Sequence, residues 1–157
     1  MILTFSKEQF VLRIPDLIKK TTIREDKLKR WKVGMKIHFW KGNPRNTRSN
    51  PFQFGEGVVS KIDRVVIDKR SPSPIRIYHD EGTRATFLCS KSDILKFAIS
   101  EGFNNANDMF KFFDKKLVGR LITWKNCTFD KEIEEMISSF EKEEYRKFKR
   151  FLAYHNK

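Results

Sequence analysis

Residues 54–68 read FGEGVVSKIDRVVID, and this stretch decides the fold. Its β-branched residues predict a long strand, which Gly57 is able to bend. Residues 75–78 and 86–89 then predict a hairpin around Asp80-Glu81-Gly82. The middle of the chain is therefore expected to be sheet.

Shorter strands are predicted on both sides of this centre, at residues 1–5, 19–25, 35–40 and 117–124. Helical spacing of apolar residues predicts helices at 8–18, 90–101, 107–114 and 130–154, with Ser92 capping the second and Gly102 ending it. No strand–helix–strand alternation with phosphate-loop glycines is present, which disfavours a doubly wound nucleotide fold. The expected fold class is α+β: a small closed β-barrel of about six strands, with flanking helices and a long C-terminal helix.

The charge of the chain is strongly positive and unevenly distributed. Lys and Arg number 33 against 20 Asp and Glu, which gives a formal net charge of +13. From position 130 onward seven basic residues are balanced by seven acidic ones, so the whole excess lies in the first 129 residues. Such a field concentrates polyanions at the protein surface. The competing interpretation is a basic surface that serves only solubility.

Length and composition narrow the class of protein. With 157 residues, 15 of them Phe, the chain can bury a core and is not a disordered basic tail. Its start turns polar after five residues, and no apolar run approaches the roughly 18 residues of a membrane span. Cys89 and Cys127 lie far apart, which favours reduced thiols. The histidines are scattered, so we expect no metal site and no other cofactor. The polar start, the absence of a long apolar run and the reduced thiols together predict a cytoplasmic protein with no membrane partner.

The segment KKTTIR at residues 19–24 contains the side chains best suited to catalysis or ligand binding. On a strand, alternate residues share a face, so each face of this segment offers an ammonium beside a hydroxyl. A lysine whose pKa is lowered by burial or by a second cation can deprotonate a neighbouring threonine. The competing interpretation is an edge strand with solvated Lys and Thr.

The same segment resembles the signature of ASCH domains, which belong to the PUA-like barrel superfamily. Lys19, Thr22, Ile23 and Arg24 match its Lys-x-x-Thr-Ile-Arg pattern. Residues 31–39 are similar to the family's W-x-x-G strand start, residues 100–103 to its acidic-Gly-Phe motif, and residues 119–124 to its last barrel strand. The resemblance implies an ASCH/PUA-like barrel domain at residues 1–126 and leaves residues 127–157 as an amphipathic helical extension packed on it.

Small bacterial members of the family resemble amidohydrolases that remove an acyl group from acetylated cytidine. The resemblance implies Thr22 as nucleophile, Lys19 as its activating base and Glu101 as proton carrier, without a metal. A hydroxyl, an amine and a carboxylate can together carry out acyl transfer. On a regular strand Lys19 and Thr22 would point to opposite faces, so the chain must turn between them or Lys19 must belong to the preceding helix end. The competing interpretation of Glu101 is a surface residue at a helix C-terminus.

The charge favours instead a protein that binds nucleic acid, either RNA or single strands, or a nucleotide. Basic residues on the rim would contact phosphates, while aromatic side chains beside the basic loop 41–53 could stack on unpaired bases. Phe39 and Phe54 are expected in the core. The residues expected to bind the nucleic acid or nucleoside-type ligand are Lys20, Arg24, His38, Trp40, Lys41, Arg45 and Arg48.

Three hypotheses remain open at this point. Binding requires only the charge and the barrel, whereas acyl-cytidine hydrolysis also requires Lys19, Thr22 and Glu101 to converge. Binding is therefore preferred and hydrolysis is the alternative. A third hypothesis, that the C-terminal helix docks a partner protein, is disfavoured because an exposed apolar stripe of that width promotes association.

Overall fold

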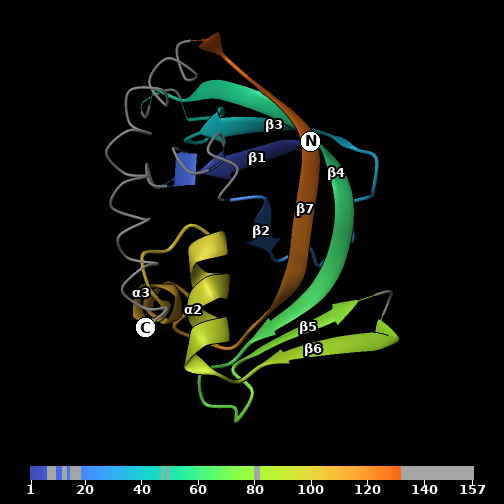
Figure 1. Ribbon diagram of the computed structural model, residues 1–157. Coiled ribbons are helices and arrows are strands. Elements are labelled where there is room, and N and C mark those ends of the chain that lie inside the picture. The colour runs from blue at the N-terminus through green and yellow to red at the C-terminus, as the bar shows by residue number, and fades with distance from the viewer. Residues whose placement is uncertain are drawn as a thin grey trace.

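The structure, a computed structural model, describes residues 1–6, 10–11, 14, 19–46, 48, 50–79 and 82–131. In this part of the chain the fold is mixed α+β, with seven strands in one open sheet and two helices (Figure 1). The elements in chain order are β1 (Ile2–Phe5), β2 (Thr21–Arg24), β3 (Lys36–Lys41), β4 (Phe52–Ile67), β5 (Ile75–His79), β6 (Arg84–Leu88), α2 (Lys91–Ser100), α3 (Ala106–Phe112) and β7 (Leu117–Phe129).

The sheet is organised around β4. One edge of β4 pairs with β7, from Gly55 opposite Phe129 to Ile67 opposite Leu117, and the two strands form the long curved pair in Figure 1. The other edge pairs with β3 near its start and with β5 at its end. β1 adds to β3 in parallel, β6 adds to β5, and β2 adds to β7. The resulting strand path is β2-β7-β4-β3-β1, with β5 and β6 as a branch.

The expected closed barrel is wrong, because the two end strands of this path do not pair. In the described part of the chain, β1 and β2 share no backbone ladder. The carbonyl oxygen of Thr4 on β1 accepts instead a hydrogen bond of 2.6 Å from Arg24 Nη2 on β2. A side chain therefore occupies the seam where a ladder would have closed the barrel, and the sheet stays open.

Aromatic side chains dominate the core. The rings of Phe39 and Phe54, both fully buried as expected, stack with centroids 5.9 Å apart, and Phe39 lies 5.3 Å from Trp124. A second aromatic group includes Phe10 and Phe103, whose ring centroids are 5.3 Å apart. Both groups belong to one continuous buried cluster, so the sheet and the helices share a single core.

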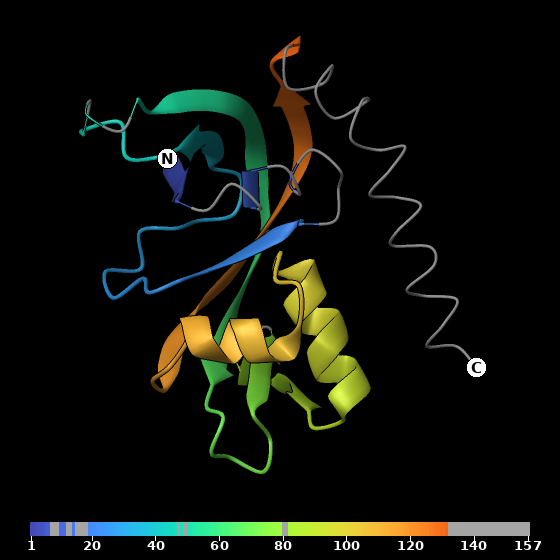
Figure 2. The same ribbon diagram turned by 90° about the vertical axis from the view of Figure 1, so that its left-hand side faces the viewer.

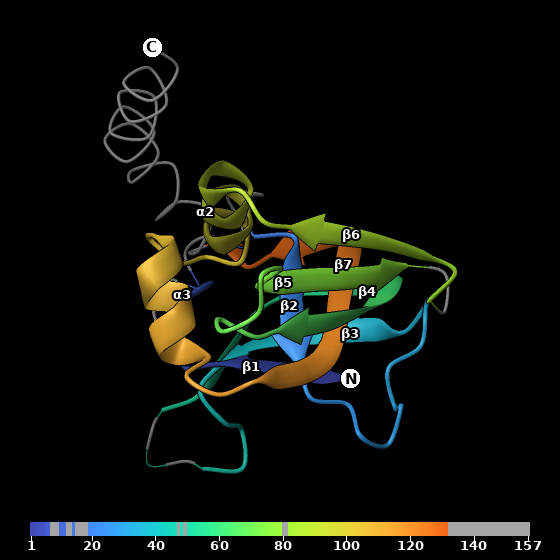
Figure 3. The ribbon, with the colours of Figure 1, turned by 90° about the horizontal axis from the view of Figure 1, so that it is seen from below.

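The helices lie beside the β5–β6 end of the sheet (Figures 2 and 3). The oxygen of the Ser90 hydroxyl accepts a hydrogen bond of 3.0 Å from the backbone N–H of Asp93, so Ser90 is the N-cap of α2 and the expected cap, Ser92, is wrong. Gly102 follows the helix with a φ of 87°, which confirms its expected role in ending the helix. None of the helices among the described residues has the length and apolar character needed to cross a membrane.

Some elements differ in extent from the expectation. The strand expected to end at Trp124 continues to Phe129, because its pairing with β4 continues through KNCTF although the apolar alternation is lost. Opposite Gly57 the extra residue of a β-bulge lies on β7, at positions 126–127, and the extra residue of β4 itself is Ser60, so the bend expected at Gly57 stays a prediction. The helices expected at 8–18 and 130–154 lie largely outside the described residues, as does most of the extension expected at 127–157.

The substitution Gly102→Ala is expected to destabilise the fold beyond the cost of its backbone conformation. A Cβ at Gly102 would lie 2.8 Å from Phe10 Cδ1 and 3.2 Å from Lys19 Cδ. Gly34 is a matched control, because its φ of 86° is nearly the same and nothing lies within 4 Å of its added Cβ. Gly34→Ala should lower the free energy of unfolding by about 1–2 kcal/mol. Gly102→Ala should lower it by about 1–3 kcal/mol more.

Urea denaturation of the two variants and the wild type measures this difference. Equal losses would contradict the close packing of Gly102 against Phe10 and Lys19.

Candidate functional site at the start of β2

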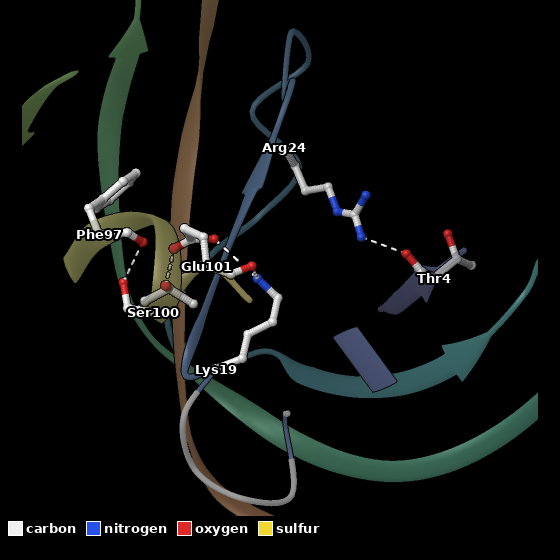
Figure 4. A network of polar contacts seen from close by, with 7 residues as sticks. Thr4, Lys19, Arg24, Phe97, Ser100 and Glu101 are labelled. Atoms are coloured by element: carbon white, nitrogen blue, oxygen red, sulfur yellow. Dashed lines mark hydrogen bonds and ion pairs between the residues drawn. The ribbon is translucent and has the colours of Figure 1, made fainter. Parts of the chain in front are cut away.

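Two residues that are distant in the sequence form the centre of the candidate site. Lys19, just before β2, and Glu101, at the end of α2, are 82 positions apart. Lys19 Nζ lies 3.2 Å from Glu101 Oε2 and donates a hydrogen bond of 2.7 Å to the Glu101 carbonyl oxygen (Figure 4). Both side chains are 3% exposed. The structure thus brings together two of the three residues expected to act in hydrolysis.

Burial makes each charge of this pair depend on the other. Removing an ammonium and a carboxylate from water costs roughly several kcal/mol per ion, and only close contact between them offsets that cost. Lys19 Nζ also lies 5.2 Å from the centre of the Phe10 ring, whose face attracts a cation. Every one of these contacts favours the charged ammonium, whereas a general base needs the free amine.

The hydroxyl that meets Glu101 belongs to Thr21. Thr21 Oγ1 donates a hydrogen bond to Glu101 Oε1, while Lys19 contacts the other carboxylate oxygen. Lys19 and Thr21 are two residues apart, which places both on one side of an extended chain. The strand spacing of the sequence placed Lys19 and Thr21 on one face, but the resemblance assigned the nucleophile to Thr22 instead. We name Lys19, Thr21, Arg24 and Glu101 the junction site.

Thr22, the expected nucleophile, lies on the other face of β2. It is 5% exposed and stands opposite Ile122 of β7. Its hydroxyl has no hydrogen-bond partner among the described residues. The structure therefore joins Lys19 to Glu101 but bonds Thr22 to neither, and the catalytic role of Thr22 stays a prediction.

Arg24 ends β2 at the open seam of the sheet. Besides its bond to Thr4, its guanidinium lies 5.5 Å from the centre of the Phe5 ring. Its Nε is buried and has no hydrogen-bond partner within the described part of the chain. Burial lowers the pKa of Arg24, and the nearby charge of Glu101 raises it in part. Arg24 is thus a cation withdrawn from water that retains an unused donor.

The expected binding residues of β3 lie in a different environment. His38 Nδ1 is 3.0 Å from Glu56 Oε1, and Lys36 Nζ is 2.6 Å from the other oxygen of that carboxylate. The hydrogen bond from Lys36 is the main reason that the pKa of Glu56 is lowered. Lys41 lies 5.8 Å from the centre of the Phe52 ring, and Trp40 is half-buried. Glu56 therefore pairs with Lys36 and His38, whereas Lys41 lies against an aromatic ring.

The remaining expected binding residues are exposed. Lys20 points to solvent at the start of β2. Arg45 and Arg48 lie in the loop after β3, where their backbone N–H groups donate to the side-chain oxygens of Asn43 and Asn46 at 3.0 and 3.3 Å. Figure 2 shows this loop projecting from the body of the protein, away from α2. None of these three cations forms a bond with the junction site in the described part of the chain.

Sequence reasoning also missed a second buried carboxylate, Asp63 of β4. Asp63 is 4% exposed, and its Oδ2 lies 2.8 Å from Lys61 Nζ and 2.9 Å from His79 Nδ1. The two-residue period of the expected strand was the available signal, because it places position 63 on the same side as the buried Val65. Asp63 pairs with Lys61 and His79 rather than joining the junction site.

The chemistry of the junction site is that of a hydroxyl, a carboxylate, an ammonium and a guanidinium. Among the residues that the structure places, no three His, Cys, Asp or Glu side chains are grouped to hold a metal ion. Neither thiol belongs to the site: Cys89 is exposed, and burial raises the pKa of Cys127. This arrangement can hold an anion through Arg24 or support proton transfer at the Thr21 hydroxyl.

Comparisons of the chain with protein-family models, with curated proteins and with solved structures find no match. The resemblance to ASCH domains therefore stays a prediction. Functional conclusions depend on the geometry of the junction site and on the distribution of charge.

Replacing Glu101 by Gln is expected to lower the free energy of unfolding by about 3–5 kcal/mol, because the Lys19 ammonium stays buried without a counter-ion. Lys19→Met should have a similar cost, since it leaves the Glu101 carboxylate unpaired. The double variant removes both charges and should recover much of the loss. Urea titration of the four proteins gives the coupling energy between the two residues.

The exposed pair Lys27 and Glu25 provides the matched control. Its atoms are 3.6 Å apart, and its side chains are 87% and 58% exposed. The corresponding cycle, Lys27→Met with Glu25→Gln, should give a coupling energy of about 0–1 kcal/mol. A similarly small value for Lys19 and Glu101 would contradict the buried ion pair.

Proposed function

We propose that the protein binds nucleic acid, as RNA or as a single strand, or a nucleotide, through an anion site centred on Arg24. The observation that carries this proposal is the state of Arg24 itself. Its guanidinium is withdrawn from water, and its buried Nε has no acceptor in the described part of the chain. A phosphate oxygen would supply the hydrogen bonds that burial removed, and guanidinium–phosphate contacts are among the strongest in proteins.

The local charge balance supports an anionic ligand. The junction site contains two cations, Lys19 and Arg24, but only one carboxylate. Because the Glu101 carboxylate is in direct contact with Lys19, the positive charge of Arg24 is not cancelled locally. The wider excess of +13 in the chain acts in the same direction by attracting polyanions.

We also infer that the chain is ASCH-like. The resemblance links Lys19 with Glu101 although 82 positions separate them, and their direct contact supports that link. The open seam between β1 and β2 departs from the closed barrel that the resemblance implies. The proposal therefore concerns the signature residues and their site.

Arg24→Gln is expected to weaken binding of a fluorescently labelled single-stranded RNA by about 10- to 100-fold, the value of one hydrogen-bonded charge contact. Arg30→Gln is the matched control, since it removes the same charge from an exposed loop residue. Fluorescence anisotropy over a series of salt concentrations measures both effects. The affinity of the wild type should fall linearly on a plot of log K against log salt.

Two outcomes would count against nucleic-acid binding through Arg24. One is an affinity that does not change with salt, which would remove the phosphate contacts from the proposal. The other is an equal loss of affinity in Arg24→Gln and Arg30→Gln, which would show that Arg24 contributes only to the net positive charge of the protein.

A second candidate function, hydrolysis of an acylated cytidine, is favoured by one contact. Glu101 accepts a hydrogen bond from a threonine hydroxyl while its other oxygen contacts Lys19. In such a reaction the threonine oxygen would form an ester with the acyl group as the C–N bond breaks. Its proton would pass through Glu101 to the leaving amine, and water would then release the acid. The contact favours Thr21 as the nucleophile, whereas the resemblance favours Thr22.

The variants Thr21→Ala and Thr22→Ala separate these possibilities. If hydrolysis occurs and follows the observed contact, Thr21→Ala should lower the turnover of acylated cytidine by about 10³-fold or more, while Thr22→Ala retains it. Chromatographic detection of the free nucleoside measures turnover. Loss in Thr22→Ala alone would restore the assignment that the resemblance implies. If the wild type itself has no turnover, hydrolysis of this substrate is excluded.

A further inference from the structure

Three arginines lie in one row across the sheet. Arg24 of β2 stands opposite Arg120 of β7, and Arg120 stands opposite Arg64 of β4. Residues directly opposite each other on neighbouring strands point to the same face. With strands about 4.8 Å apart, the two outer arginine backbones are separated by roughly 10 Å. The row continues to Tyr78 of β5, which stands opposite Arg64.

This row works against the stability of the sheet. Like charges directly opposite each other on adjacent strands are destabilising. Within the described residues, neither Arg24, Arg64 nor Arg120 forms an ion pair with a carboxylate. Asp63, the nearest acidic neighbour of Arg64 in sequence, stands opposite Leu121 and points to the other face. The chain thus concentrates positive charge where folding alone would disfavour it.

Aromatic side chains accompany the arginines on the same face. The guanidinium of Arg64 lies 5.3 Å from the centre of the Tyr78 ring. Two residues along β5, Arg76 stands opposite Phe87 of β6, and the Phe87 ring is 55% exposed. The buried Nε of Arg76 has no acceptor in the described part of the chain. The opposed pair of Arg76 and Phe87 therefore also combines an arginine that has an available donor with an aromatic ring.

We propose that this surface, which we name the arginine face (Arg24, Arg64, Arg76 and Arg120 with Tyr78 and Phe87), binds a single-stranded nucleic acid. Phosphates contact the arginine row, and unpaired bases stack on the Phe87 and Tyr78 rings. A polyanion supplies the countercharge that the row lacks. The exposed Phe87 ring favours a single strand over a duplex or an acidic protein surface, because only a single strand offers unpaired bases that can stack on it. The proposal rests on the proposed function, because the same strand reaches the junction site at Arg24.

The first test compares two double variants with the same loss of charge. Arg64→Gln/Arg120→Gln removes two members of the row, while Arg30→Gln/Arg70→Gln removes two exposed loop arginines. Anisotropy with a labelled single-stranded uridine oligomer should show a loss of more than tenfold for the row variant. The slope of log K against log salt should decrease by about 1.4, as expected for two phosphate contacts on a single strand. The loop variant should change the affinity less.

The second test uses aromatic side chains. Phe87→Ala should weaken binding by about 5- to 150-fold, the range for one stacked base. Phe112→Ala, at a ring that is 46% exposed on α3, is the control and should bind as the wild type does. Because Phe87 is largely exposed, its variant is expected to fold even if the double arginine variant does not. Thermal unfolding checks the fold of each variant, and relief of like-charge repulsion means that the row variant should be no less stable than the wild type.

The outcomes separate this inference from the proposed function. If the wild type binds the single strand but neither the row variant nor Phe87→Ala weakens it more than its control does, the arginine face is wrong and the proposed function stands. If the wild type binds no single-stranded RNA or DNA at low salt, both fail. A deoxythymidine oligomer and a duplex of equal length complete the comparison. Preference for the duplex would contradict base stacking on Phe87.

Discussion

A buried ion pair between Lys19 and Glu101 joins the start of β2 to the end of α2. A single unpaired charge in the interior would strongly destabilise the fold, so the fold must bury both side chains in contact with each other. The backbone after α2 accommodates this contact by turning at Gly102, where a side chain would collide with Phe10 and with the methylene groups of Lys19. Thr21 then meets Glu101 because it lies on the same side of β2 as Lys19. One electrostatic requirement thus brings Lys19, Thr21 and Glu101 together, whereas Arg24 lies on the other face of β2 and feels the charge of Glu101 without a bond to it.

The open seam of the sheet follows from what β2 contributes there. β1 and β2 are the free ends of the strand path, and each has four residues. The guanidinium of Arg24 satisfies the carbonyl oxygen of Thr4, and its charge cannot be buried deeper without an anion. A barrel closed by backbone pairing would remove that donor from the seam. The departure from the closed barrel and the availability of Arg24 therefore have the same physical cause.

The basic residues differ in whether they have a carboxylate partner, and those without one lower the stability of the fold. Lys19, Lys61 and Lys36 all have carboxylate partners, whereas Arg24 and Arg120 have none among the residues that the structure describes. Natural sequences generally agree with their fold at every level, and the exceptions occur where a ligand is bound. A row of opposed arginines is such an exception. The same reasoning connects the junction site with the arginine face, because Arg24 belongs to both.

The sequence by itself determined the local elements of this protein. β-branched residues predicted the long central strand, helical spacing and Gly102 predicted α2, and both features can be read within a few neighbouring residues. It also placed Phe39 in the core, and the resemblance to ASCH domains placed Lys19 with Glu101 in one candidate set. Only the tertiary structure decided that the sheet stays open and that Thr21, not Thr22, meets Glu101. Strand side chains alternate with a period of two, so a shift of one residue in register exchanges the two threonines. That register depends on the pairing of β2 with β7, which lies a hundred positions later in the chain. The spacing of neighbouring residues does not reveal such a pairing.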